Sequence, residues 1–134
     1  MRTKLRVIHL ITGVVVVLIF LVTGLLMRFN YRPAFESNYF VRMLFRSSHI
    51  YILLSGLINI TLGSYLRISG RKPAQLIQIL GSIFILIAPV LLIGAFFYEP
   101  FRQSLNRPIT LFAMILLLSG TVLHMLGSIR MAEA

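Results

Sequence analysis

Three histidines are the residues of this 134-residue chain best suited to hold a metal ion or a cofactor. His9 lies near the beginning of the first long apolar run, His49 opens the second, and His124 lies near the end of the last. An ionisable side chain inside a membrane-spanning segment costs free energy, so each of these histidines needs a functional or a structural explanation.

His9 and His124 have the neighbours that a pair of haem ligands would need. Two imidazoles that face each other across a helical bundle can coordinate a haem iron from both sides. Gly13 and Gly120 each lie four residues from one of these histidines, on the same helix face, and would make room for the porphyrin. Arg6, three residues before His9, is placed to bind a haem propionate. The sequence therefore predicts one b-type haem with His9 and His124 as its axial metal ligands.

The same residues also have a structural interpretation. Glycines are frequent in membrane helices because they let backbones approach closely, and histidines there can hydrogen-bond a neighbouring helix or a headgroup. Under this alternative the protein is a non-catalytic small membrane subunit or interaction protein. His49 has no second histidine at its depth, so a second haem is not expected. His49 stays a candidate for contact with a cofactor, a quinone or a headgroup, or for a structural role.

Composition places the chain in the membrane. Hydrophobic residues make up 58% of it, and cysteine is absent, which excludes disulfides, iron–sulfur clusters and covalently attached haem. The net charge of +10 comes from 13 Lys and Arg against three acids. Because the basic residues lie between the apolar runs, the expected partner is a lipid bilayer with anionic headgroups, and no nucleic acid.

Four apolar runs are each long enough to cross a bilayer as a helix, which takes roughly 20 residues. The predicted fold class is all-α: an integral membrane four-helix bundle with antiparallel up-down spans, forming a single domain over 1–134. The loops are short except for the connection 28–48, which is expected to hold either an interfacial helix capped by Ser37 or an irregular aromatic loop. The predicted spans are 7–27, 49–68, 76–98 and 109–128.

An even number of spans returns the chain to its starting side. His9 and His124 are therefore expected at similar depth, and His49 near the opposite face. Both termini share one side of the membrane, and a slight excess of Lys and Arg there favours the cytoplasm. No span contains an acid, which argues against proton-coupled transport, and no acid is in reach to orient a Ser/His nucleophile.

The first span resembles the opening helix of prokaryotic cytochrome b561-type proteins, which include the cytochrome b subunits of membrane hydrogenases and formate dehydrogenases. Arg6, His9 and the later pair Thr23-Gly24 carry the resemblance, and His49 and His124 extend it loosely. It implies four helices, b-type haems held by histidines of helices 1, 2 and 4, and electron transfer between quinone and a redox partner. The chain departs from that pattern at Leu10, where the family usually has tryptophan, and in offering one histidine in helix 4 where two-haem members have two.

The sequence thus predicts a membrane b-type cytochrome that carries one haem between the first and last helices and transfers single electrons. A quinone and a redox partner protein are its candidate partners, and a homo-oligomer its candidate assembly. If the protein is redox-active, it is an electron-transfer cytochrome rather than a hydrolase or a transporter. The expected location is a bacterial inner membrane.

Overall fold

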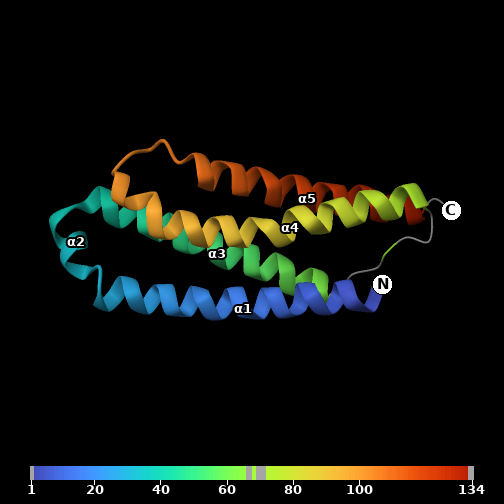
Figure 1. Cartoon of the computed structure of the whole chain (residues 1–134), viewed down its shortest axis with the longest axis horizontal. Coiled ribbons are helices and arrows are strands. Elements are labelled where there is room, and N and C mark those ends of the chain that lie inside the picture. The colour runs from blue at the N-terminus through green and yellow to red at the C-terminus, as the bar shows by residue number, and fades with distance from the viewer. Residues whose placement is uncertain (1, 66–67, 69–71, 133–134) are drawn as a thin grey trace.

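A computed structural model describes residues 2–65, 68 and 72–132, and it is almost entirely helical (Figure 1). Within these residues, four helices are long and apolar enough to cross a membrane. The predicted all-α four-helix membrane bundle is therefore confirmed. The elements are α1 (Arg2–Phe29), α2 (Arg32–Ser37), α3 (Tyr39–Tyr65), α4 (Lys72–Tyr98), the 3-10 helix η1 (Pro100–Arg102) and α5 (Pro108–Ala132).

The four spans are arranged as two tight pairs. Helix α1 packs along α3, α4 packs along α5, and α3 and α4 join the pairs. Among the described residues, the backbones of α1 and α5 nowhere come within 8 Å of each other, counted between Cα atoms. The beginning of α1 and the end of α5 still lie at the same end of the bundle, as antiparallel up-down spans require (Figure 1).

Glycines explain why each pair is tight. A methyl group on Gly13 of α1 would lie 2.6 Å from the backbone nitrogen of Ile60 in α3. One on Gly120 of α5 would lie 2.8 Å from the carbonyl oxygen of Gly81 in α4. Only a residue without a side chain allows such close backbone approach, which membrane helices use to gain van der Waals contact.

The connection 28–48 differs from both sequence expectations. A short helix, α2, occupies its beginning, and α3 starts at Tyr39, ten residues before the predicted second span. The side-chain oxygen of Asn38 accepts the backbone N–H groups of Phe40 (3.0 Å) and Val41 (3.3 Å), so Asn38 rather than Ser37 caps this helix. The separate helix predicted to begin at Ser37 does not form, because α3 runs without interruption from Tyr39 through His49.

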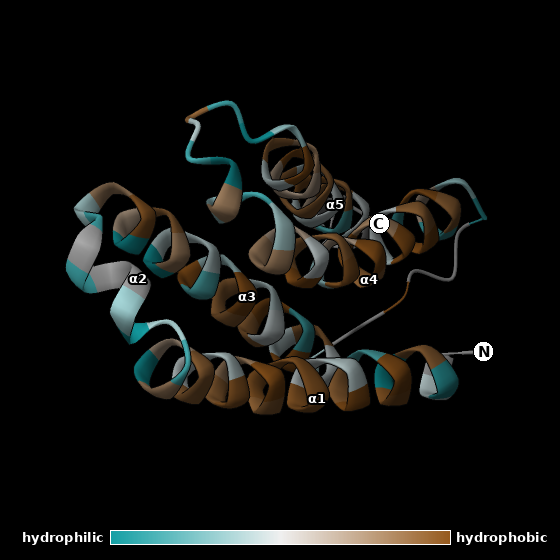
Figure 2. Ribbon diagram, turned by 60° about the vertical axis from the view of Figure 1, so that its left-hand side comes forward, coloured by the Kyte–Doolittle hydropathy of each residue, from teal (hydrophilic) through white to brown (hydrophobic). Residues whose placement is uncertain are grey.

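Hydropathy follows the spans. Apolar residues dominate the middle of the long helices, and polar residues gather at their ends and on α2 (Figure 2). Many large apolar side chains of α1 are exposed in the isolated chain, as expected for a surface that faces lipid. Most of the connection between α3 and α4 falls outside the described residues, and Lys72 and Pro73 lie in the first turn of α4.

Candidate functional site

His9 is completely buried and is oriented by Asn59 of α3. The His9 Nδ1 atom lies 2.7 Å from the side-chain oxygen of Asn59. The Asn59 amide nitrogen donates to the carbonyl oxygens of Ser55 (2.9 Å) and Ile85 (3.3 Å), which fixes the orientation of the amide. Because the Asn59 oxygen can only accept, Nδ1 of His9 carries a hydrogen and donates it to that oxygen. The other ring nitrogen, Nε2, is buried and has no hydrogen-bond partner.

His124 reaches the same region from α5. Its side chain is buried, and its Nε2 atom lies 2.7 Å from the hydroxyl oxygen of Ser82 in α4. Each of the four spans therefore contributes a polar side chain to one buried cluster. We refer to these residues as the histidine cluster: His9, Asn59, Ser82 and His124.

Helices α1 and α5 are not neighbours: within the described residues they are the one pair of spans with no Cα atoms within 8 Å of each other, and only side chains such as these two imidazoles approach across the bundle. Their ring centres are 6.4 Å apart, and their planes are inclined at 81°. Two imidazoles that bind one metal ion on opposite sides, each at a metal–nitrogen distance of about 2 Å, have ring centres roughly 6.3 Å apart. The separation of His9 and His124 therefore suits a shared ion, as does the unpartnered buried nitrogen of His9.

The other residues predicted for the haem site lie elsewhere. Gly13 and Gly120 face α3 and α4, where they allow close helix packing, so neither opens a slot between α1 and α5. Arg6 donates to the carbonyl oxygens of Gly63 (3.4 Å) and Ser64 (3.0 Å), near the C-terminus of α3. Such carbonyls lack partners within their own helix and attract cations. Gly13, Gly120 and Arg6 are thus engaged in contacts between helices and do not form the haem surroundings predicted from the sequence.

His49 belongs to α3 and lies away from the histidine cluster, where it packs against the second half of α1. Its Nδ1 atom is 3.0 Å from the hydroxyl oxygen of Thr23. The Thr23 hydroxyl donates its hydrogen to the carbonyl oxygen of Phe20 (2.9 Å). The imidazole stacks on the Phe20 ring with centres 3.9 Å apart, and its Nε2 edge faces Gly24. Thr23 and Gly24, which carry much of the resemblance in the first span, are therefore contacts of His49.

Sequence reasoning missed a second buried polar cluster, at the opposite end of the bundle. Glu99, 1% exposed, accepts the backbone N–H groups of Ile109 (2.7 Å) and Thr110 (3.3 Å), at the start of α5. Arg107 forms an ion pair with Glu99 at 3.5 Å and donates to the hydroxyls of two α3 residues. In the sequence, the available signal was the pair of opposite charges, Glu99 and Arg107, that flank the connection between α4 and α5. We refer to these residues as the ion-pair cluster: Ser47, Ser48, Glu99, Arg107 and Thr110.

Ser82 was also missed as a partner of a histidine. In the sequence it is one of several small residues of the third span, and small residues there indicate helix packing. Only the placement of α4 against α5 shows that this hydroxyl meets His124. Asn59 carries a stronger signal in the sequence than Ser82 does, because an amide in the middle of an apolar run needs a hydrogen-bond partner.

The fold and the site define a class of protein: an integral membrane four-helix bundle with a histidine pair buried between its first and last spans. No known protein family, characterised protein or solved structure matches this chain. The resemblance to b561-type cytochromes stays a prediction, and function has to be argued from the histidine cluster itself.

Proposed function

We propose that the protein is a membrane b-type cytochrome whose single haem is held by His9 and His124. The observation that carries the proposal is the buried, unpartnered Nε2 of His9, together with a second imidazole whose ring centre is 6.4 Å away. A buried polar atom without a partner costs free energy, roughly 1–3 kcal/mol. Coordination of an iron ion would remove that cost.

The neighbours of His9 suit a ligand role. A metal-bound histidine normally donates its other ring N–H to an acceptor, which fixes the tautomer and raises the basicity of the ligating nitrogen. Asn59 occupies that position, because its oxygen accepts from Nδ1 at 2.7 Å and leaves the lone pair of Nε2 free. In this role Asn59 would orient the ligand without touching the haem.

A bound haem would supply one-electron transfer, and the protein would set its potential through the two imidazoles and the apolar surroundings. The chain would hold the haem near the membrane end where α1 begins and α5 ends. A quinone and a redox partner protein in a bacterial inner membrane are the electron carriers that this function requires. Anionic headgroups would meet the basic residues at the helix ends.

One observation favours the alternative, a non-catalytic membrane subunit with structural histidines. The Nε2 atom of His124 already has a partner in the Ser82 hydroxyl, at 2.7 Å. Ligation through that nitrogen requires the hydroxyl to turn away. Under the alternative, the histidine cluster is a hydrogen-bonded contact that holds the two helix pairs together.

Absorption spectroscopy of protein purified from haem-replete cells separates the two functions. The cytochrome should show a Soret band and sharp α and β bands on reduction, and His9→Ala and His124→Ala should each abolish them. His49→Ala is the matched control and should keep the spectrum. Added imidazole should restore haem binding to His9→Ala, because the substitution leaves a space of that shape. Colourless protein, or bleaching by His49→Ala, would contradict the proposal.

A further inference from the structure

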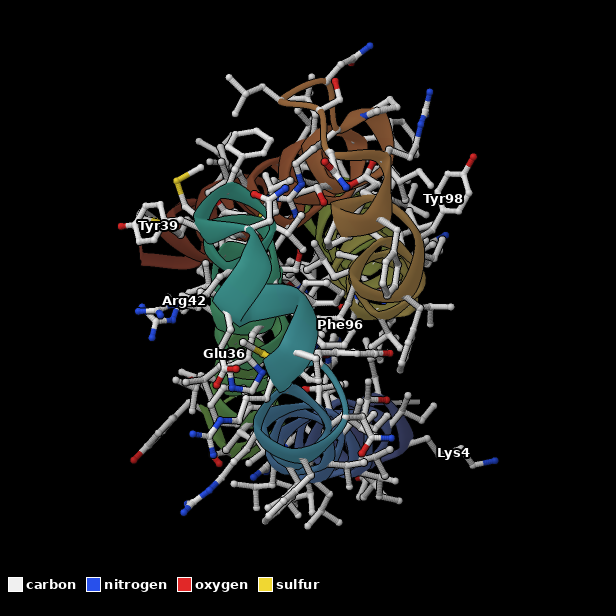
Figure 3. All side chains as sticks on the ribbon, turned by 90° about the vertical axis from the view of Figure 1, so that its left-hand side faces the viewer. Lys4, Glu36, Tyr39, Arg42, Phe96 and Tyr98 are labelled. Atoms are coloured by element: carbon white, nitrogen blue, oxygen red, sulfur yellow. The ribbon has the colours of Figure 1, made fainter. Side chains whose placement is uncertain are left out.

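An open cleft lies at the end of the bundle opposite the histidine cluster, where α1 ends, α2 crosses and α3 begins. It has a volume of about 500 Å³. Figure 3 looks onto this end and shows the labelled Arg42 and Glu36 close together beside α2, at the edge of the molecule. We refer to it as the arginine cleft, and it is lined by Gly24, Met27, Arg28, Arg32, Glu36, Arg42 and Arg46.

The cleft carries more positive charge than the protein neutralises. Of its four arginines, only Arg32 has a carboxylate partner, Glu36, at 3.0 Å, and both side chains are well exposed. Within the described part of the chain, Arg28, Arg42 and Arg46 form no ion pair. The Nε atom of Arg42 is moreover buried without a hydrogen-bond partner. A buried guanidinium N–H that has no acceptor in the protein is costly, so an external acceptor is expected there.

The position of the cleft identifies the acceptor. Helices α1 and α3 have 28 and 27 residues, more than the roughly 20 that cross the hydrocarbon core of a bilayer. Arg28 near the end of α1 and Arg42 near the start of α3 are therefore expected at the level of the lipid phosphates. Gly24 and Met27 extend one wall of the cleft into the span. Beside them, Val22 and Leu25 are more than half exposed and present an apolar surface to lipid. A ligand with a phosphate head and acyl chains matches both the arginines of the cleft and the apolar surface of α1 beside it.

We infer that the arginine cleft is a binding site for an anionic phospholipid. The guanidinium groups of Arg28, Arg42 and Arg46 donate to the oxygens of its phosphate, and Arg42 Nε gains the acceptor that the protein does not provide. Guanidinium groups suit this role because their planar donors match phosphate oxygens. The acyl chains lie along the exposed apolar surface of α1. The site is independent of the histidine cluster and of haem.

Lipid binding to the full chain in a neutral detergent tests the inference, measured by native mass spectrometry. Phosphatidylglycerol should bind in a saturable manner with one lipid held tightly, and phosphatidylcholine should not. Arg42→Gln should weaken phosphatidylglycerol binding about five- to tenfold, the effect of losing one cation that contacts the headgroup. Arg28→Gln, on the other helix, should weaken it by a similar factor.

Arg102→Gln is the matched control. It removes the same charge at the same end of the bundle, from an exposed arginine over the ring of Tyr98 and outside the cleft, so binding should stay within twofold of the parent protein. Equal losses for Arg42→Gln and Arg102→Gln would overturn the inference, since net charge alone would then account for binding. Competition by glycerol phosphate as strong as that by the lipid would also overturn it, in favour of a soluble anion. Circular dichroism of each variant verifies that its helices are intact.

Discussion

The two buried polar clusters lie at opposite ends of the bundle and differ in how completely the protein satisfies them. In the ion-pair cluster, the carboxylate of Glu99 accepts backbone and hydroxyl hydrogens and balances the charge of Arg107. Arg107 Nε has no hydrogen bond, but it is the atom that lies 3.5 Å from the carboxylate. In the histidine cluster, Nε2 of His9 has neither a hydrogen bond nor a charge beside it.

This difference separates a structural cluster from a candidate binding site. Glu99 satisfies N–H groups at the start of α5, and Arg107 ties that end to the hydroxyls of Ser47 and Ser48 in α3. The ion-pair cluster therefore needs nothing from outside the chain. The histidine cluster needs one more partner, so we expect substitutions in the first to affect stability and those in the second to affect haem binding.

The largest expected effect is the loss of stability in Glu99→Gln. Removing one partner of a buried ion pair leaves an uncompensated charge and costs about 3–5 kcal/mol. Thermal unfolding in detergent, followed by circular dichroism, measures this loss. The matched control is Glu36→Gln, whose exposed pair with Arg32 is worth no more than about 0.5 kcal/mol. Equal effects of the two substitutions would contradict a structural role for the ion-pair cluster.

Gly13→Ala tests whether this glycine belongs to the helix contact or to the haem site. Its methyl group would meet the backbone of Ile60, and overpacking of this kind costs about 1–3 kcal/mol. We expect a lower unfolding temperature, with haem bound in the same ratio to folded protein. Gly94→Ala, whose methyl group would meet nothing within 4 Å, should leave stability nearly unchanged. Loss of haem from a Gly13→Ala protein of normal stability would restore the role predicted from sequence.

Ser82→Ala has the smallest expected effect and distinguishes the two functions of His124. In haem-free protein, the substitution removes one hydrogen bond and should cost about 1 kcal/mol. Haem should then bind about fivefold more tightly, because Nε2 of His124 no longer has to release a partner first. Titration of haem into the purified haem-free protein measures this change. Weaker haem binding by Ser82→Ala would contradict ligation through that nitrogen.

Asn59→Leu tests the neighbour that orients His9. Removing a partner of this kind typically lowers metal affinity 10- to 100-fold. The same titration measures the change, and the absorption bands should persist at saturating haem because both ligands remain. An unchanged affinity would show that His9 is positioned by packing alone.

Much of the fold follows from sequence because apolar runs of sufficient length have one stable conformation in a bilayer, where the backbone must satisfy its own hydrogen bonds. The start of α3 did not follow. The amphipathic stretch from Tyr39 to His49 suits an interfacial helix as well as it suits the first turns of a span. The cap at Asn38 and the burial of Leu44 and Phe45 against the bundle decide between these.

The candidate site was predictable only in part. His9 and His124 could be paired because an even number of spans fixes their depth. The helix faces could not be assigned, because Gly13 and Gly120 lie one turn from a histidine whether they line a slot or pack on another helix. The role of these glycines depends on which pairs of spans pack most closely. Four apolar helices of similar length carry little information about their order around the bundle.

The most direct test of shared ligation is the electron paramagnetic resonance spectrum of the ferric protein in frozen membranes. Imidazole planes inclined at 81° should give the strongly anisotropic low-spin signal of a near-perpendicular ligand pair. His9→Ala and His124→Ala should each convert that signal to high spin or remove it. A spectrum without haem, or a low-spin signal that survives both substitutions, would contradict the assignment of His9 and His124 to one iron.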